Sequence, residues 1–173
     1  EVLNIIPRKN GKSIDAAAVG LYMLTSDGEF GSEVYCGATS EKQANEVFTP
    51  AKRMLKSNSE LMNYLDLSIQ KQSIFRESDN AFFQRVIGDP PDGTSPHCGI
   101  VDEYHEHKKD AVYKTFQTGM GARENPLLYV ITTAGDNING PCHEKVQECI
   151  QILEGVLTDD HADSTLVLIY TID

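Results

Sequence analysis

Residues 2–13 decide the fold of this chain, and they read Val2-Leu3-Asn4-Ile5-Ile6-Pro7-Arg8-Lys9-Asn10-Gly11-Lys12-Ser13. The apolar run at 2–6 is too short for a helix and rich in β-branched residues, so it predicts a buried strand. The polar stretch 7–13 favours a turn. Apolar residues then recur at helical spacing: Ile14, Ala17, Ala18, Leu21 and Leu24. A strand, a turn with glycine and a helix, in this order, are the setting of a phosphate-binding loop.

The tripeptide Gly11-Lys12-Ser13 supplies the chemistry that such a loop needs. Backbone N–H groups and the helix N-terminus point at the phosphates, the lysine adds a positive charge, and the serine hydroxyl ligates Mg²⁺. Ile6 stands where the pattern G-x-x-x-x-G-K-[ST] has its first glycine. The tripeptide alone also fits a solvated turn with a surface lysine. The strand before it and the helix after it favour phosphate binding.

Strands and helices alternate along the rest of the chain. We expect strands at 34–36, 98–101, 127–131 and 166–170, with short strands between 67 and 87 around a turn at Asp79-Asn80. Ser40 and Gln43 predict a capping box at the start of a helix in which Pro50 should cause a kink. Further helices are expected over 109–118 and along an apolar stripe from Val146 to Leu157. The pattern predicts a three-layer α/β fold with a mainly parallel central sheet.

An acidic pair, Asp102-Glu103, follows the apolar strand 98–101 directly. At the carboxyl edge of a parallel sheet both carboxylates would face the same crevice as the phosphate loop. Asp102 would then hold Mg²⁺, and Glu103 would act as the general base that activates water. The alternative is an acidic cap on the next helix. A glutamate after the aspartate favours hydrolysis by water over phosphate transfer to a substrate.

Composition sets wider limits on function. The 173 residues fit one domain. A net charge of −11 argues mildly against nucleic-acid binding, unless local basic residues such as Lys52, Arg53 and Lys56 bind the nucleic acid. With no apolar run that could cross a bilayer and no recognisable signal peptide, we expect a cytoplasmic protein without membrane contact. The four cysteines form no C-x-x-C pair and are expected in the core.

Two histidines close to the acidic pair, His105 and His107, suggest a metal site at first sight. Their spacing does not match H-E-x-x-H, and the sequence offers no evident third ligand. Histidines in solvent or in support of the neighbouring acids are the better interpretation.

Taken together, the motifs resemble one family. Residues 7–13 resemble the deviant Walker A motif of phage large terminase subunits, which carries an arginine four places before the lysine. The run His97–His105 resembles their Walker B motif, and Leu127–Gly135 is similar to their coupling motif, a strand end rich in threonine. Residues 119–124 and the closing run Leu168–Asp173 also fit.

This resemblance implies a P-loop NTPase of the ASCE, RecA-like class that uses ATP and Mg²⁺. The family translocates double-stranded DNA into a procapsid, as a ring of usually five subunits that works with the portal and the small terminase subunit. We therefore expect an ATPase domain over residues 1–173, in the cytoplasm of an infected or prophage-carrying bacterium. The family's nuclease domain and its adenine-contacting region are expected to be absent.

The resemblance also implies roles for single residues. The nucleotide-binding set is Pro7, Arg8, Lys9, Asn10, Gly11, Lys12 and Ser13, with Arg8 sensing the outer phosphate. Thr132 and Thr133 would read the nucleotide state. Arg123, or Arg85 after it, would act on the neighbouring subunit's ATP. Two rival functions remain: another ASCE ATPase such as a helicase-like DNA translocase, and a nucleotide-binding assembly scaffold that does not hydrolyse ATP.

Overall fold

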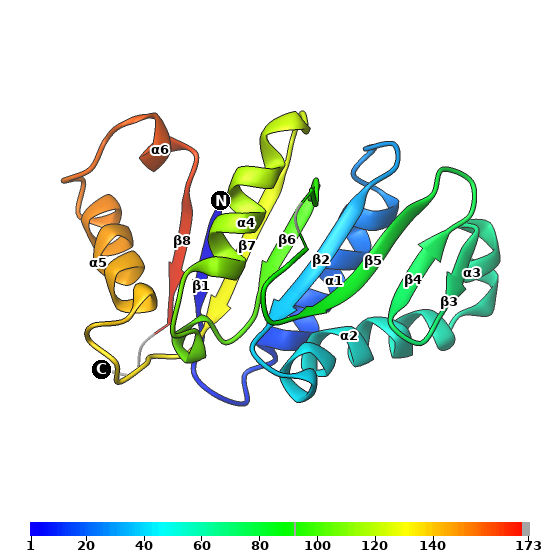
Figure 1. Ribbon diagram of the computed structural model, residues 1–173, viewed down its shortest axis with the longest axis horizontal. Coiled ribbons are helices and arrows are strands. Elements are labelled where there is room, and N and C mark those ends of the chain that lie inside the picture. The colour runs from blue at the N-terminus through cyan, green and yellow to red at the C-terminus, as the bar shows by residue number, and fades with distance from the viewer. Residues whose placement is uncertain (92, 171–173) are drawn as a thin grey trace.

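The computed structural model describes residues 1–91 and 93–170, and an eight-stranded sheet runs through their centre (Figure 1). Helices cover both faces of the sheet, which confirms the three-layer α/β prediction. No helix in the described ranges has the length and apolar character needed to cross a membrane. The strands are β1 (Val2–Ile5), β2 (Glu33–Ala38), β3 (Leu67–Ile69), β4 (Ser73–Arg76), β5 (Ala81–Ile87), β6 (Cys98–Val101), β7 (Leu127–Thr132) and β8 (Leu166–Ile169).

The strand order β3-β4-β5-β2-β6-β7-β1-β8 determines which loops meet. From β5 to β8 all neighbouring strands are parallel, and only β3, β4 and β5 pair antiparallel at one side. The turn between β4 and β5 contains Asn80 at φ 61°, as the sequence predicts. Strands β1 and β6 both lie next to β7, so the loop after β1 and the residues after β6 emerge at the same carboxyl edge, one strand apart.

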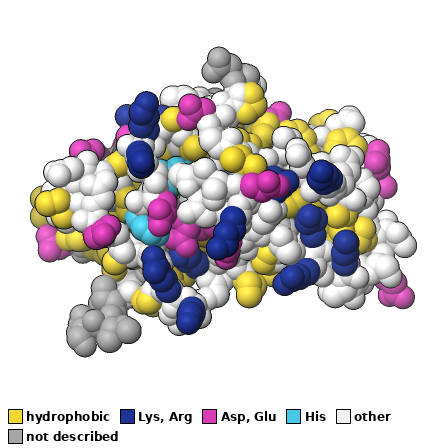
Figure 2. All heavy atoms as spheres, turned by 60° about the horizontal axis from the view of Figure 1, so that its bottom comes forward, with side chains coloured by type: hydrophobic (Ala, Val, Ile, Leu, Met, Phe, Trp, Pro, Cys, Tyr) yellow, Lys and Arg dark blue, Asp and Glu magenta, His cyan; other side chains and the backbone are white. Residues whose placement is uncertain are grey.

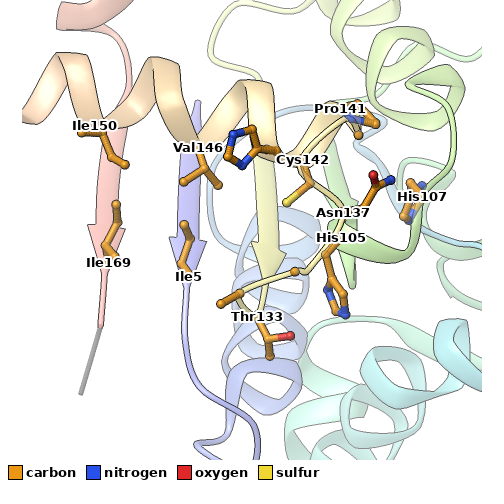
Figure 3. A pocket seen from close by; sticks show the side chains of 14 residues that line it. Ile5, His105, His107, Thr133, Asn137, Pro141, Cys142, Val146, Ile150 and Ile169 are labelled. Carbon is orange, nitrogen blue, oxygen red and sulfur yellow. The ribbon is translucent and has the colours of Figure 1, made fainter. Parts of the chain in front are cut away.

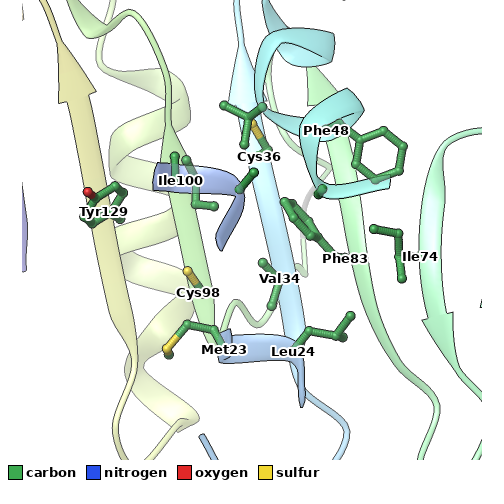
Figure 4. Packing of buried hydrophobic residues seen from close by; sticks show 14 of the residues in the cluster. Met23, Leu24, Val34, Cys36, Phe48, Ile74, Phe83, Cys98, Ile100 and Tyr129 are labelled. Carbon is green, nitrogen blue, oxygen red and sulfur yellow. The ribbon is translucent and has the colours of Figure 1, made fainter. Parts of the chain in front are cut away.

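Helices α1 (Lys12–Thr25), α2 (Glu41–Lys56) and α3 (Ser59–Tyr64) belong to one face. The other face carries α4 (Ala111–Gly119) and α5 (Pro141–Leu153), with the short helices η1 (Tyr104–Glu106), η2 (Met120–Ala122) and α6 (Asp160–Asp163) in the connections. Side chains alternate between the faces, as strand geometry requires. Figure 4 shows Val34, Cys36 and Ile100 facing the α1 side among Phe48 and Phe83.

Two glycines bring α4 against the sheet. A Cβ added at Gly37 of β2 would lie 2.4 Å from Val112, and one added at Gly99 of β6 would lie 2.8 Å from the Phe116 ring. Both contacts are closer than real side chains allow, so these positions need glycine for space rather than for backbone freedom. Because η1 lies between β6 and α4, this packing also limits where the residues after β6 can lie.

The structure corrects several helix predictions. The stripe was expected to reach Leu157, but α5 ends at Leu153, because Gly155 adopts a left-handed conformation (φ 72°) that stops the helix. Val156 is therefore 66% exposed. Ile14 and Ala18, expected on the buried face of α1, are both exposed, because the buried stripe of the helix is turned toward Ala16, Ala17, Gly20, Met23 and Leu24.

Three further local predictions concern the cap of α2, the cysteines and the closing run of the chain. Helix α2 begins at the Ser40 cap, where the hydroxyl accepts from the Gln43 N–H at 3.3 Å, and it runs on through Pro50. All four cysteines are buried and unpaired, as predicted. In the closing run Leu168–Asp173, residues 171–173 lie outside the described ranges.

Candidate nucleotide site at the carboxyl edge

The loop between β1 and α1 has the backbone of an anion-binding turn. Gly11 immediately precedes α1 and adopts φ 80°, and Lys9 adopts φ 68°. Nothing lies within 4 Å of a Cβ added at Gly11, so glycine is required there by its backbone angle rather than by crowding. The Asn10 amide donates to the carbonyls of Pro7 and Arg8, at 3.2 Å each. The loop is thus held by its own side chain, with the N-terminus of α1 open to solvent.

Lys12 and Glu103 meet at this edge. The Lys12 Nζ lies 2.6 Å from Glu103 Oε1, although the two residues lie far apart in the chain. Lys12 is only 7% exposed. Glu103 adopts φ 48°, a left-handed backbone that costs a non-glycine residue energy and that the surrounding structure must therefore hold in place. The sequence prediction that the first helix and the acidic pair converge is confirmed.

The acidic pair is incompletely satisfied. Asp102 is 1% exposed, and its Oδ1 accepts from the Glu103 N–H at 2.9 Å. Across residues 1–91 and 93–170, the only buried carboxylate oxygens without a hydrogen-bond partner are Asp102 Oδ2 and Glu103 Oε2. Burial, together with the negative charge of Glu103, raises the pKa of Asp102 to about 7, although the Lys12 charge opposes both effects.

These features fit a divalent cation. Mg²⁺ prefers hard oxygen ligands, and Asp102 Oδ2 is such an oxygen, buried and without a partner. Ser13, half-buried in the first turn of α1, presents a hydroxyl beside Lys12. A cation here would offset the cost of a buried carboxylate that has only one hydrogen bond.

The predicted coupling threonines end the strand between β1 and β6. Thr132 is fully buried, and its hydroxyl accepts from the backbone N–H of His105 at 3.1 Å. The His105 Nδ1 lies 3.0 Å from the same hydroxyl, and the hydroxyl donates to the Thr133 carbonyl at 3.0 Å. His105 Nδ1 also lies 3.3 Å from Glu103 Oε2. Thr132 therefore reaches the acidic pair through His105.

A cleft of about 280 Å³ opens over this arrangement. Its lining residues are Arg8, Ser40, Lys42, Gln43, Glu46, Glu103, His105 and Glu106. Figure 2 views the molecule with the carboxyl edge turned forward, and lysine and arginine side chains lie there close to the acidic and histidine side chains. The cleft thus brings Arg8 and Glu103 to one solvent-accessible space, although the chain as a whole is acidic.

A second cavity, of about 260 Å³, has His105 in its lining (Figure 3). Its wall is mostly apolar, from Ile5, Val146, Ile150 and Ile169. His105 lines both this cavity and the cleft.

The two arginines expected to act on a neighbouring subunit are both engaged within the chain. Arg123 lies at the amino edge, where it donates to the Ser95 carbonyl at 2.9 Å and pairs with Glu29 at 3.0 Å and Glu33 at 3.4 Å. Arg85 donates to Asn45 at 2.8 Å and pairs with Glu41 at 2.9 Å.

The basic residues of helix α2 have two kinds of surroundings. Lys56 is exposed and Lys52 lies over the Phe48 ring, with its Nζ 4.7 Å from the ring centroid, while Arg53 lies in the last turn of the helix and is also exposed.

Sequence reasoning missed the link between His105 and Thr132. It placed His105 near the acids only by its position in the chain. The contact depends on β7 lying beside β6, which the sequence does not state. A second missed contact joins Asn4 to Tyr129 at 3.1 Å and Tyr129 to Asp15 at 2.6 Å, beneath the phosphate loop.

Comparison with known proteins agrees with this geometry. Residues 1–150 match the family described as the ATPase domain of the terminase large subunit. Protein YmfN of Escherichia coli (strain K12) is 46% identical over 107 residues, which are 62% of this chain and 23% of that protein. The large terminase subunit of Enterobacteria phage HK97 is 29% identical over 137 residues, 76% of this chain and 27% of that protein. The chain thus spans about a quarter of the length of these relatives.

Solved structures show the same fold. The crystal structure of the HK97 large terminase superposes with a TM-score of 0.82 over 99% of this chain and 35% of that one, at 24% identity. The large terminase of a thermophilic bacteriophage, in complex with ATP-γ-S, gives a TM-score of 0.57 over 93% of this chain and 45% of that one, at 12% identity. With the family match over residues 1–150, the chain belongs to the ATPase domains of the terminase large subunits.

Proposed function

We propose that this chain is the motor that hydrolyses ATP to translocate double-stranded viral DNA into a procapsid, with residues 1–173 forming its ATPase domain. The observation that carries the proposal is the 2.6 Å contact between Lys12 and Glu103 at the carboxyl edge. It joins a phosphate-binding helix start to a candidate general base with an unpaired oxygen. Lys12 is buried and Glu103 is partly exposed and lines the cleft, so an incoming phosphate would compete with Glu103 for Lys12.

In the proposed reaction the loop residues 7–13 hold the phosphates through backbone N–H groups, and Lys12 contacts the outer phosphates. Ser13 and Asp102 would hold Mg²⁺, which supplies positive charge beside the β- and γ-phosphates when bound. Glu103 Oε2, which has no hydrogen-bond partner among the described residues, accepts the proton of the attacking water. The water oxygen bonds to the γ-phosphorus, and the bond from that phosphorus to the ADP oxygen breaks.

Arg8 and the two threonines have supporting roles in this proposal. Arg8 lines the cleft with Glu103, so its guanidinium is placed to stabilise or sense the outer phosphate. Thr132 and Thr133 read the nucleotide state from the strand beside both motifs. The contacts of the Thr132 hydroxyl lead to His105, and from the His105 ring to Glu103, so the influence of Thr132 on the base would pass through His105.

Translocation needs partners that the chain does not contain. We propose a homo-oligomeric ring, five subunits in the packaging complex, that acts in the host cytoplasm with the portal and the small terminase subunit. Arg123 is the first candidate for the arginine given to a neighbour and Arg85 the second. Either role requires the guanidinium to leave its present carboxylates when the neighbour docks. Lys52, Arg53 and Lys56 on α2 are the candidates for DNA contact.

A packaging assay with procapsids tests the proposal. We expect the protein to protect DNA from nuclease in an ATP-dependent way, and Lys12→Ala and Glu103→Gln to abolish this protection. Lys114→Ala is the control, because Lys114 is exposed on α4 and pairs with Asp110 on the same helix face. ATP-dependent strand separation without protected DNA would assign the chain to a helicase-like ATPase. Nucleotide binding without turnover in the complete assembly would assign it to a scaffold.

A further inference from the structure

We propose that His105 is a positioning residue for Glu103 and forms the physical link between that carboxylate and the end of β7. The inference rests on the proposed function, because it assigns how the general base is held. It follows from three sets of contacts around the His105 ring.

The first set fixes the ring to β7. A threonine hydroxyl has one proton to donate and two lone pairs that accept. Thr132 donates its proton to the Thr133 carbonyl and accepts from the His105 backbone N–H. The remaining lone pair has His105 Nδ1 at 3.0 Å and the weaker donor Cys142 Sγ at 3.9 Å, and the shorter contact favours a ring proton on Nδ1. His105 is therefore attached to Thr132 by both its backbone and its ring.

The second set places the ring beside the base. His105 Nδ1 lies 3.3 Å from Glu103 Oε2, whereas Glu103 Oε1 is held by Lys12 at 2.6 Å. Phosphates compete for Lys12 and would release Oε1. His105 then remains as the group next to the carboxylate. The backbone of Glu103 itself is in an unfavourable left-handed conformation. Only a fixed neighbour would keep the carboxylate aligned with water in that state.

In the third set, the loop after β7 packs against the His105 side chain. A Cβ added at Gly135 would lie 2.8 Å from the His105 Cβ, so the loop passes closer than any other residue type allows. The His105 side chain is 10% exposed. A movement of the β7 end or of this loop is thus transmitted to the ring, and from the ring to Glu103. A cavity of about 260 Å³ that is lined by His105, Thr133 and Gly135 gives space for such a movement (Figure 3).

The test separates the Nδ1 contact from the rest of the imidazole. His105→Asn keeps an amide nitrogen near the position of Nδ1, whereas His105→Ala and His105→Gln do not. We measure steady-state ATP hydrolysis by the complete protein assembled with procapsids and DNA, together with ATP-γ-S affinity. A displaced base costs about ten- to a hundredfold in rate. We expect that loss of kcat in the Ala and Gln variants, little change in KM or affinity, and a rate within about threefold of wild type in the Asn variant.

A double variant tests the link to β7. If His105 acts through Thr132, Thr132→Val should lower kcat alone but add little to His105→Ala, because both remove the same attachment. Independent, additive losses would overturn the link. Thermal denaturation of each variant identifies those that fail to fold. If His105→Ala does not fold, the comparison of His105→Asn with His105→Gln carries the test, because both are polar replacements.

Glu103→Gln in the same assay distinguishes failure of this inference from failure of the proposed function. An inactive Glu103→Gln beside a fully active His105→Ala overturns the role of His105 and leaves the general base in place. Normal turnover by Glu103→Gln removes the base itself, and the positioning role with it. A His105→Ala variant that raises KM at unchanged kcat assigns His105 to substrate binding and also overturns the inference.

Discussion

The two edges of the central sheet differ in whether their carboxylates are paired within the chain. At the amino edge, Arg123 pairs with Glu29 and Glu33, and Asp79 accepts four hydrogen bonds, so these charged groups are satisfied within the chain. At the carboxyl edge, Asp102 and Glu103 each keep a buried oxygen without a partner. Burying such carboxylate oxygens costs free energy, and at the amino edge the unpartnered buried atoms of the described residues, Thr94 Oγ1 and His97 Nδ1, are not carboxylate oxygens.

The paired charges at the amino edge serve stability, and the unpaired carboxylate oxygens at the carboxyl edge serve function. Charges paired inside the chain hold loops together and need no ligand. Charges left unpaired in a cleft are placed for a ligand that brings the missing partners. Substitutions at the carboxyl edge should therefore reduce turnover with little loss of stability, and substitutions at the amino edge should do the reverse.

Lys12→Ala should have the largest effect. It removes the cation that contacts Glu103 at 2.6 Å and that would contact the outer phosphates. We expect turnover to fall by a factor on the order of a thousand and ATP-γ-S affinity to fall with it. Calorimetric titration and phosphate release measure the two effects. A variant that binds and hydrolyses ATP normally would contradict the assignment of the loop.

Glu103→Gln should separate binding from chemistry. The amide keeps the shape of the side chain but cannot take a proton from water, so we expect a loss of about a hundred- to ten-thousandfold in kcat with ATP-γ-S affinity retained. Glu60→Gln, an exposed glutamate in the first turn of α3 and outside the cleft lining, is the control and should keep its rate. Equal losses in both variants would mean that general charge, rather than the base, matters.

Asp79→Asn should act on stability alone. Hydrogen bonds from the Arg76 side chain lower the pKa of Asp79 from its ordinary 3.8 to about 2, and N–H groups of Gly31 and Ala81 also lower it. The carboxylate thus contributes stability that is complete above its unfolded pKa and is lost as the pH falls through about 2. We expect the variant to lose about 2 kcal/mol at neutral pH, measured by urea denaturation.

The pH dependence is the control for that assignment. The stability difference between wild type and Asp79→Asn should narrow as the pH falls from about 4 to about 2, since the Asp79 carboxyl takes up its proton near 3.8 in the unfolded chain but only near 2 in the folded one. A difference that stays constant through this range would show that the charge is not what matters. ATP turnover per folded molecule should be unchanged.

Arg123→Gln sharpens the comparison, because Arg123 belongs to the amino edge by its contacts and to the active site by family resemblance. Loss of the pairs with Glu29 and Glu33 should lower stability by about 1 to 2 kcal/mol, or a few degrees in Tm. If Arg123 also serves a neighbouring subunit, turnover in the assembled complex falls while ATP-γ-S affinity persists. Stability loss with normal turnover would leave the trans role to Arg85.

Lys114→Ala sets the lower limit of the series. The Lys114 side chain is 68% exposed and pairs with Asp110 one helical turn away. Such pairs contribute about 0.3 to 0.5 kcal/mol. Neither Tm nor turnover should change beyond experimental error, and a large effect on either would mean that surface charge on α4 matters for the motor.

Sequence patterns predicted the sheet and the two motifs from local signals, and the convergence of the motifs followed from placing both at the carboxyl ends of parallel strands. Gly11-Lys12-Ser13 follows a short apolar strand, and Asp102-Glu103 ends another, so each motif is recognisable from its own neighbours. The end of α5 was missed although Gly155 signals it, since the apolar stripe continues past that glycine. The contact of His105 with Thr132 depends on strand order across the sheet, and no local pattern encodes it.

A structure with Mg²⁺ and ATP-γ-S bound is the most direct measurement of the central claim. We predict that the γ-phosphate takes the place of Glu103 beside Lys12, that the 2.6 Å contact opens, and that His105 keeps its contact with Thr132. A nucleotide bound elsewhere, with Lys12 and Glu103 still paired, would contradict the account.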